Sequence, residues 1–172
     1  VIDGKSLTMV GYYNTEYEGP PVVSGPLLIT GDVDLHVRGV EFWARPDIDY
    51  DSTPSGYTDP HNVRIMGATG RIVFEHCYFN IGELFYNEPL PNPADGAIEI
   101  TDSAVELTLV GCQVVAKGVN SLPITEPKSA LVTRGGANRI AIYSSDLRAG
   151  GGGGFDTPCL LYTSPSPRDR YI

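Results

Sequence analysis

Three acidic residues alternate in one segment of the chain and could bind a cation. Asp47, Asp49 and Asp51 lie within WARPDIDYDSTPSGYTDPHN. Alternating carboxylates suit a hard cation such as Ca²⁺, which takes about six to eight oxygen ligands. The calcium loop of EF-hand proteins would also need Gly and Glu where Ser52 and Thr58 stand, so that motif is absent. We expect a solvated acidic loop, with a Ca²⁺ site at the three aspartates as the alternative.

Aromatic rings and polar groups gather in the same segment and in a later one. Aromatic faces flanked by polar groups suit sugar rings, because they combine apolar contact with hydrogen bonds. The alternative is that the rings pack these segments onto the rest of the fold, and we prefer it for most of them. The residues that could bind sugar are Trp43, Tyr50, Tyr57, His61, Glu83 and Tyr86, with Phe85 beside them.

The elements that must position these residues are repeated short strands. Five segments align without gaps in the order apolar, any, apolar, any, turn residue, small or apolar, any, apolar, and only the first departs from it, with Asn14 in the final apolar position. Their first residues are separated by 28, 37, 35 and 33 positions. Period-2 alternation inside a longer repeat predicts strands that stack coil upon coil. The segments are LTMVGYYN from Leu7, LHVRGVEF from Leu35, IVFEHCYF from Ile72, LTLVGCQV from Leu107 and IAIYSSDL from Ile140.

A second strand is expected before each of the last four segments, with a turn-rich link such as GATG or RGGA between the two. These strands are LLIT, VRIM, IEIT and LVTR, which begin at Leu27, Val63, Ile98 and Leu131. Alternate residues should point inward and stack in columns on coils about 4.8 Å apart. The inward residues would be Leu35, Val37, Val40 and Phe42, then Ile72, Phe74, Cys77 and Phe79, then Leu107, Leu109, Cys112 and Val114, and last Ile140, Ile142, Ser145 and Leu147.

Outward residues should form columns of their own. Where Arg and Glu are neighbours in such a column, we expect an exposed pair worth about 0 to 1 kcal/mol. In one column two acids are separated by roughly 14 Å from the strand spacing, which is too far for the carboxylate pair of a glycosidase. The columns are Arg38, Glu75, Val110 and Tyr143; Arg64, Glu99 and Val132; and Glu41, Tyr78, Gln113 and Asp146, of which the last holds the two acids.

The turn position of the repeat favours residues that tolerate a positive φ, which glycine adopts at no steric cost. His76 stands in this position and could be a general base, since its unperturbed pKa lies near neutrality. We expect instead a turn residue in a left-handed conformation. Cys77 and Cys112 are expected to be small buried hydrophobes rather than a disulfide or reactive thiols. The turn column holds Gly11, Gly39, His76, Gly111 and Ser144.

The coil pattern resembles the right-handed parallel β-helix of the pectate-lyase-like superfamily over nearly all of residues 1–155. The opening KSLTMVG, followed by VVSG, is similar to the first complete coil of pectin methylesterases and their relatives. The resemblance implies an all-β, single-stranded solenoid of about five coils, truncated at both ends. Its long loops would emerge side by side on one face, and they are Trp43–Asn62, Ile81–Ala97 and Ala116–Ala130.

A β-sandwich of short strands is the rival architecture. It would need hairpin turns between neighbouring strands, and only Asp3-Gly4 and Asp95-Gly96 qualify. The phase of the repeat therefore favours the β-helix.

The resemblance also implies enzyme signatures that can be sought in the chain. Polygalacturonases need Asn-Thr-Asp, Asp-Asp, His-Gly and Arg-x-Lys, pectin methylesterases need Gln-Asp, and pectate lyases need Trp-x-Asp-His. None of these occurs, since Asn14-Thr15 is followed by Glu16 and Trp43 by Ala44. Catalytic residues therefore stay unassigned.

The C-terminal segment differs in kind from the repeats. CLLYTSPSPRD, from Cys159 to Asp169, resembles a translated transposase mosaic end and adapter of a sequencing library. We expect residues 1–155 to form the β-helix fragment and residues 156–172 to be a non-native tail outside the fold. The chain would then be an open reading frame cut at both ends and assembled from environmental DNA.

The net charge limits which kinds of partner the chain can bind. Without residues 159–172 it holds 10 basic and 20 acidic residues, a formal charge of −10. This acidic balance argues against nucleic acid and anionic membranes, which select clustered Lys and Arg. No stretch approaches the roughly 18 apolar residues of a membrane span.

We therefore expect an extracellular or virion-surface module that binds or processes polysaccharide through loops on one face. An enzyme of this kind would be a polysaccharide lyase, a glycoside hydrolase or a carbohydrate esterase. The alternative is a purely structural phage tail-spike shaft or adhesin without catalytic activity, which as a tail spike could form a homotrimer.

Overall fold

The computed structural model describes residues 1–12, 19–24, 27–44, 63–81, 96–116, 119–121, 124–126, 129–150 and 156–158. All the regular elements among these residues are strands, as the period-2 alternation predicts. In chain order they are β1 (Ile2–Asp3), β2 (Ser6–Val10), β3 (Val22–Ser24), β4 (Leu27–Arg38), β5 (Glu41–Ala44), β6 (Val63–Glu75), β7 (Tyr78–Ile81), β8 (Gly96–Thr101), β9 (Ala104–Val110), β10 (Gln113–Ala116), β11 (Val119–Ser121), β12 (Ile124–Glu126), β13 (Ser129–Arg134), β14 (Arg139–Tyr143), β15 (Asp146–Gly150) and β16 (Asp156–Pro158).

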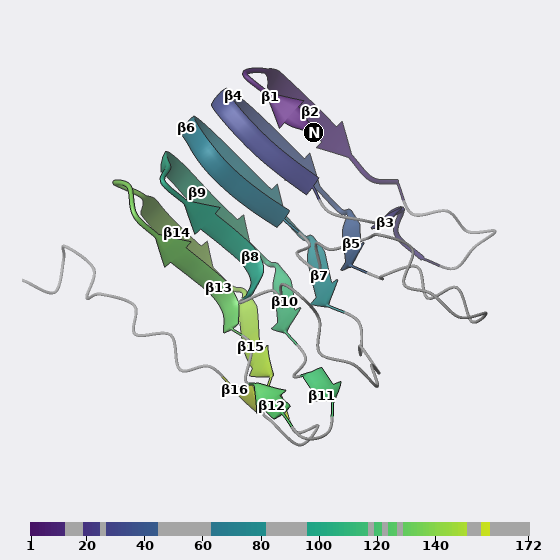
Figure 1. Ribbon diagram of the computed structural model, residues 1–172. Coiled ribbons are helices and arrows are strands. Elements are labelled where there is room, and N and C mark those ends of the chain that lie inside the picture. Colours follow the sequence, from purple (N-terminus) through teal and green to yellow (C-terminus); the bar gives the residue numbers. More distant parts are fainter. Residues whose placement is uncertain are drawn as a thin grey trace, which may run out of the picture.

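An eight-stranded sheet contains the first part of every repeat. Its main order is β1-β4-β6-β8-β13, while β2 pairs with β4 and β9 pairs with both β6 and β14. All these pairs are parallel (Figure 1). The first residues of the five repeats are in register with one another, in the order Leu7, Leu35, Ile72, Leu107 and Ile140. The gap-free sequence alignment is thus confirmed as strand register.

A six-stranded sheet contains the short strand that follows each turn. Its order is β16-β15-β10-β7-β5-β3, and its strands are parallel from β3 to β15. The last strand, β16, pairs antiparallel with β15. Strands β11 and β12 form a separate antiparallel pair, which lies within the third segment predicted to be a loop.

Strands β4 and β6 are longer than the sequence predicts. We expected two strands and a turn-rich link, but β4 has 12 residues and β6 has 13. Each contains glycine with positive φ, which is 72° at Gly31 and 95° at Gly70. A Cβ at Gly70 would lie 2.1 Å from the carbonyl oxygen of Val33. Glycine therefore lets the chain change direction while neighbouring strands stay paired.

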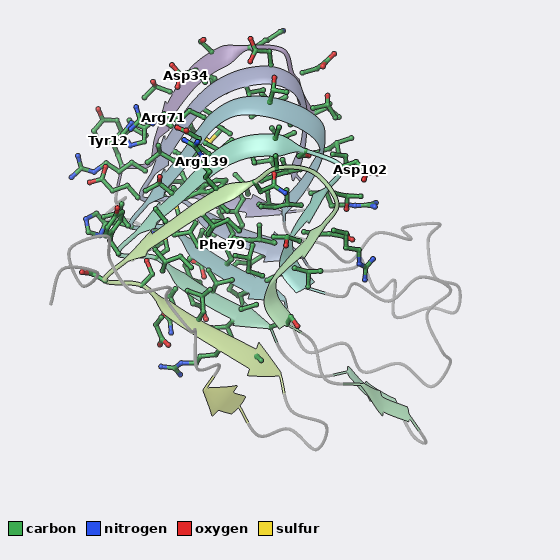
Figure 2. The ribbon with its side chains drawn as sticks, turned by 90° about the vertical axis from the view of Figure 1, so that its left-hand side faces the viewer. Tyr12, Asp34, Arg71, Phe79, Asp102 and Arg139 are labelled. Carbon is green, nitrogen blue, oxygen red and sulfur yellow. The ribbon has the colours of Figure 1, made fainter. Side chains whose placement is uncertain are left out.

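The core lies between the two sheets and consists of the residues expected to point inward. In the second, third and fourth repeats all twelve of these residues are buried, none more than 3% exposed. The rings of Phe42 and Phe79 stack with centroids 5.0 Å apart, and Phe74 meets Phe79 edge-on at 5.1 Å. Figure 2 shows Phe79 between the ribbons, whereas Asp34, Arg71 and Arg139 point outward. Ile140, on the last strand of its row, is 38% exposed.

The turn column adopts the conformation that its residues predict, with one exception. The φ angle is positive at Gly39 (65°), His76 (50°), Gly111 (59°) and Ser144 (48°). The backbone N–H of His76 donates to the carbonyl of Val110 at 2.8 Å, so the turn of one repeat bonds to the next strand. The expected turn role of His76 is thereby confirmed. Gly11 is the exception, because its φ is not positive.

The chain in the described ranges is all-β, with parallel strands in both large sheets, and this is compatible with a β-helix. The expected boundary at residue 155 stays a prediction, although β16 places residues 156–158 beside β15. Residues 159–172 lie outside the described residues.

Among the described residues there is no helix that is long and apolar enough to cross a membrane.

Candidate functional site

Most residues predicted to bind a ligand lie outside the part of the chain that the structure describes. Trp43 is the exception. The proposed sugar-binding and calcium-binding residues therefore stay predictions. Those outside the described residues are Tyr50, Tyr57, His61, Glu83, Phe85 and Tyr86, together with Asp47, Asp49 and Asp51.

Trp43 lies on β5 opposite Asn80 of β7. It follows the buried Phe42, so strand alternation turns it to the other face of the sheet, where it is half-buried. The indole Nε1 of Trp43 and the side-chain Oδ1 of Asn80 are both buried and have no hydrogen-bond partner in this structure. A donor and an acceptor thus stand unsatisfied on neighbouring strands, at the first residue of one predicted loop and just before another.

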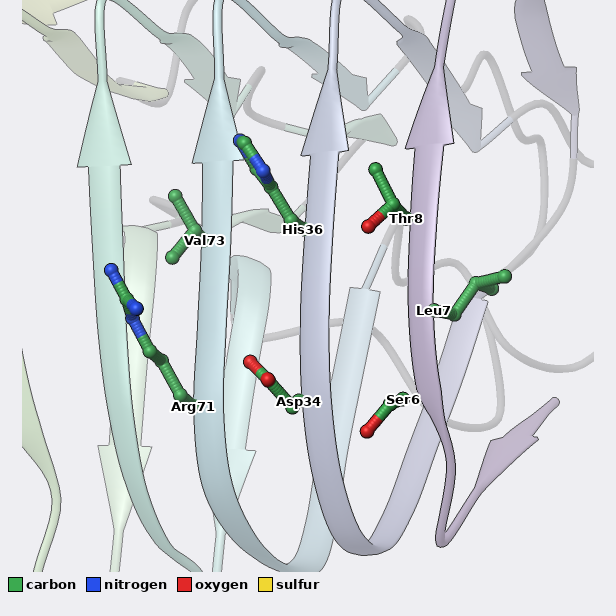
Figure 3. A pocket seen from close by; sticks show the side chains of 7 residues that line it. All are labelled: Ser6, Leu7, Thr8, Asp34, His36, Arg71 and Val73. Carbon is green, nitrogen blue, oxygen red and sulfur yellow. The ribbon is translucent and has the colours of Figure 1, made fainter.

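An open depression lies on the outer face of β2, β4 and β6 (Figure 3). Its volume is about 390 Å³. Because residues of like parity share one face of a strand, two outward positions from each strand line it. The lining residues are Ser6, Thr8, Asp34, His36, Arg71 and Val73, with Leu7 at the edge.

The lining side chains form two rows that cross the strands. Ser6, Asp34 and Arg71 are in register, and so are Thr8, His36 and Val73. Both rows continue beyond the depression onto β9 and β14. The first row ends with Glu106 and Arg139, and the second with Thr108 and Ala141.

Asp34 and Arg71 are opposite one another but do not form an ion pair. Both are exposed, and no salt bridge joins either of them to a described residue. Glu106 and Arg139, farther along the same row, are joined at 3.2 Å. The polar groups of Asp34 and Arg71 are therefore available to a ligand on this face.

Glu75 orients the imidazole that borders the depression. Its Oε2 lies 3.2 Å from Nε2 of His36, and its Oε1 lies 3.7 Å from Nε of Arg38. The same Oε1 is 3.8 Å from Nε2 of His76. His76 lines a second open depression of about 370 Å³ beyond the turn, next to Glu41, Tyr78 and Gln113. Glu75 thus connects the walls of two surface depressions.

Glu99 corrects the expectation of exposed Arg–Glu pairs. Arg64 and Glu99 are in register as predicted, but Glu99 is only 5% exposed. Its Oε2 lies 3.7 Å from Nε of Arg64, and its Oε1 lies 3.2 Å from Nη1 of Arg134. Two guanidinium groups, from the strands on either side, cover the carboxylate and offset the loss of water. The Glu99 carboxylate is therefore buried between two more exposed arginines and does not form an exposed pair.

The burial of the two cysteines agrees with their expected role as small buried hydrophobes. Cys77 and Cys112 are free and each is 2% exposed. Their thiols donate to backbone carbonyls, Cys77 to Val37 at 3.5 Å and Cys112 to Phe74 at 3.3 Å. A hydrogen bond with Cys112, together with burial, raises the pKa of the Cys77 thiol.

Sequence reasoning missed the residues of the outer depression. Ser6, Thr8, Asp34, His36 and Arg71 flank the apolar residues of the repeat, and outward positions have no constrained residue type. The register was the one available signal, because it places Asp34 beside Arg71.

Within the described ranges, no group of three or more His, Cys, Asp or Glu residues is placed to hold a metal ion. No family model, curated protein or solved structure matches the chain. Its function is therefore inferred from the geometry of the described residues.

Proposed function

We propose that this chain is part of a right-handed parallel β-helix, about five coils long, that binds polysaccharide at its outer surface in an extracellular or virion-surface setting. The parallel, in-register stacking of the repeats supports a coil architecture. The observation that carries the binding function is the polar depression over β2, β4 and β6 (Figure 3).

The chemistry of this depression suits hydroxyl groups. Asp34 can accept hydrogen bonds from sugar hydroxyls, Arg71 can donate to sugar oxygens, and the hydroxyls of Ser6 and Thr8 can do both. These groups are held on paired strands rather than on loops, so little backbone entropy is lost when a ligand binds. Trp43 lies on the other sheet and offers an aromatic surface there. Sugar binding by the predicted loops beside it is a separate proposal.

A glycan array tests the binding function directly. Fluorescently labelled full-length chain should bind a subset of polysaccharides, and unlabelled chain should compete for the same spots. Reducing-end and unsaturated-product assays on each bound polysaccharide then tell a binding module from a hydrolase or lyase. Failure of folded chain, verified by circular dichroism, to bind any glycan would overturn the proposal.

A purely structural shaft is the second candidate, and the pairing of surface charges favours it. Glu75 and Glu106 both have basic partners on neighbouring strands, and such pairs tie one strand to the next without any ligand. As a tail-spike shaft the chain would form a homotrimer. Multi-angle light scattering tests this candidate, since a monomer at all concentrations contradicts the trimeric shaft.

A further inference from the structure

We infer that the outer depression selects a neutral, linear polysaccharide and orients it along the stack, across strands β2, β4 and β6. This inference rests on the proposed polysaccharide-binding function and adds the charge class of the ligand and its direction. It concerns the strand face that Figure 3 shows, not the predicted loops.

The direction of the ligand follows from the two rows of side chains. Both rows run across the strands, with one step for each strand. Strands in a sheet are about 4.8 Å apart, so the five-strand rows are roughly 19 Å long. The row from Thr8 to Ala141 contains mostly short side chains, and His36 is its one large member. A linear ligand that lies along this row would contact the longer polar side chains of the other row at each strand.

The charge class follows from the sign of that longer row. After Ser6 the signs alternate, from Asp34 to Arg71 to Glu106 to Arg139. A polyanion attracted by Arg71 would also lie beside Asp34 and Glu106, and a polycation would meet the two arginines. A neutral chain avoids both repulsions, since its hydroxyls donate to carboxylates and accept from guanidinium groups. The formal charge of −9 on the whole chain also repels polyanions.

The position of the ligand follows from which charged side chains of the row already have an ion-pair partner. Glu106 and Arg139 bond to each other at 3.2 Å, whereas Asp34 and Arg71 have no ion pair with any described residue. The nitrogen of His36 that faces Glu75 is held at 3.2 Å, so the imidazole has a fixed orientation at the border of the depression. The strongest contacts to a ligand should therefore come from β4 and β6.

Calorimetric titration of the full-length chain tests charge class and position together. The probes are linear hexasaccharides of glucose, xylose and mannose, of galacturonic acid, and of glucosamine. At least one neutral hexasaccharide should bind, while the acidic and the cationic ones bind at least about tenfold more weakly, which corresponds to about 1.4 kcal/mol. Tighter binding of a charged hexasaccharide would overturn the charge class.

Matched variants test the position. Thr8→Arg obstructs the depression, whereas Thr133→Arg places the same side chain at an exposed position of β13, outside both rows. Arg71→Ala removes a ligand donor, whereas Arg148→Ala removes an arginine of the other sheet that is paired with Asp146. Arg71→Ala should weaken binding about tenfold or more, as loss of a charged hydrogen bond does, and Thr8→Arg should weaken it at least as much because its side chain fills the depression. The two controls should change binding less than about twofold.

The outcomes separate the two proposals. If none of the hexasaccharides or array polysaccharides binds, the proposed function itself fails. If a neutral glycan binds equally to all four variants, polysaccharide binding stands and the depression is not its site. Thermal unfolding of each variant shows that a loss of binding is not a loss of fold.

Discussion

Glu99 and Glu106 belong to consecutive strands, and each has an arginine from a later strand at 3.2 Å. Their surroundings differ greatly. The Glu99 side chain is 6% exposed, whereas that of Glu106 is 60% exposed and its partner Arg139 is 84% exposed. The same bond length therefore describes two different interactions.

The difference teaches that burial, rather than distance, sets what an ion pair contributes. Exposed pairs are worth about 0 to 1 kcal/mol, because water screens them and two long side chains lose freedom. Removing one partner of a buried pair costs about 3 to 5 kcal/mol, because the other charge is left without compensation. Arg64 is partly buried and Arg134 is exposed, so the loss at Glu99 should lie toward the lower end.

The largest difference is expected when each carboxylate is neutralised at constant shape. Glu99→Gln should lower the free energy of unfolding by about 2 to 4 kcal/mol, since two guanidinium groups lose their counter-charge. Glu106→Gln, the matched control, should lower it by less than about 1 kcal/mol. Urea denaturation followed by circular dichroism measures both. Equal losses in the two variants would show that burial does not govern these pairs.

Double-mutant cycles sharpen the comparison to single contacts. The coupling between Glu99 and Arg134 should be about 1 to 3 kcal/mol, because the two share a buried network. The coupling between Glu106 and Arg139 should be at most about 0.5 kcal/mol. Alanine at each position, singly and together, supplies the free energies. A coupling at Glu99 no greater than that at Glu106 would mean that Arg134 does not compensate the buried carboxylate.

Salt should produce the smallest effect and act on one pair only. At about 1 M salt the Debye length falls to roughly 3 Å, so exposed charges are screened while buried ones are much less affected. The loss of unfolding free energy caused by Glu106→Gln should disappear at high salt. The loss caused by Glu99→Gln should remain. Unfolding at both salt concentrations checks this. A parallel decline in the two variants would indicate that water reaches Glu99.

The sequence predicts the register well because the repeat contains its own alignment. Leu35, Ile72 and Leu107 fall opposite one another since each begins the same pattern. The glycine and histidine of the turn column were likewise readable, because a positive φ restricts which residues fit.

Other features depend on neighbours that a linear pattern does not show. Arg134 lies opposite Thr101 in the sheet, and only the path of its side chain brings it to Glu99. Asp34 and Arg71 line a depression because of the sizes of the side chains next to them. The repeat pattern does not specify the size of outward side chains. The merging of two expected strands into β4 depends on pairing with β6 on both sides of a register shift between Ile29 and Gly31, so the turn-rich link marked this shift and not the end of a strand.

The in-register stacking of repeats also determines how this chain must fold. In the eight-stranded sheet paired residues are 27 residues apart at the closest, as for Ile2 and Ile29, and 37 at the farthest, as for Arg38 and Glu75. Each strand there pairs with a strand that lies about one repeat away in the chain. Closing a loop of that length loses entropy before any contact is gained. Chains dominated by distant pairings fold in milliseconds to seconds rather than microseconds. Once two repeats have paired, each later repeat adds to a sheet edge that is already formed. The pairing of the first two repeats therefore limits the folding rate.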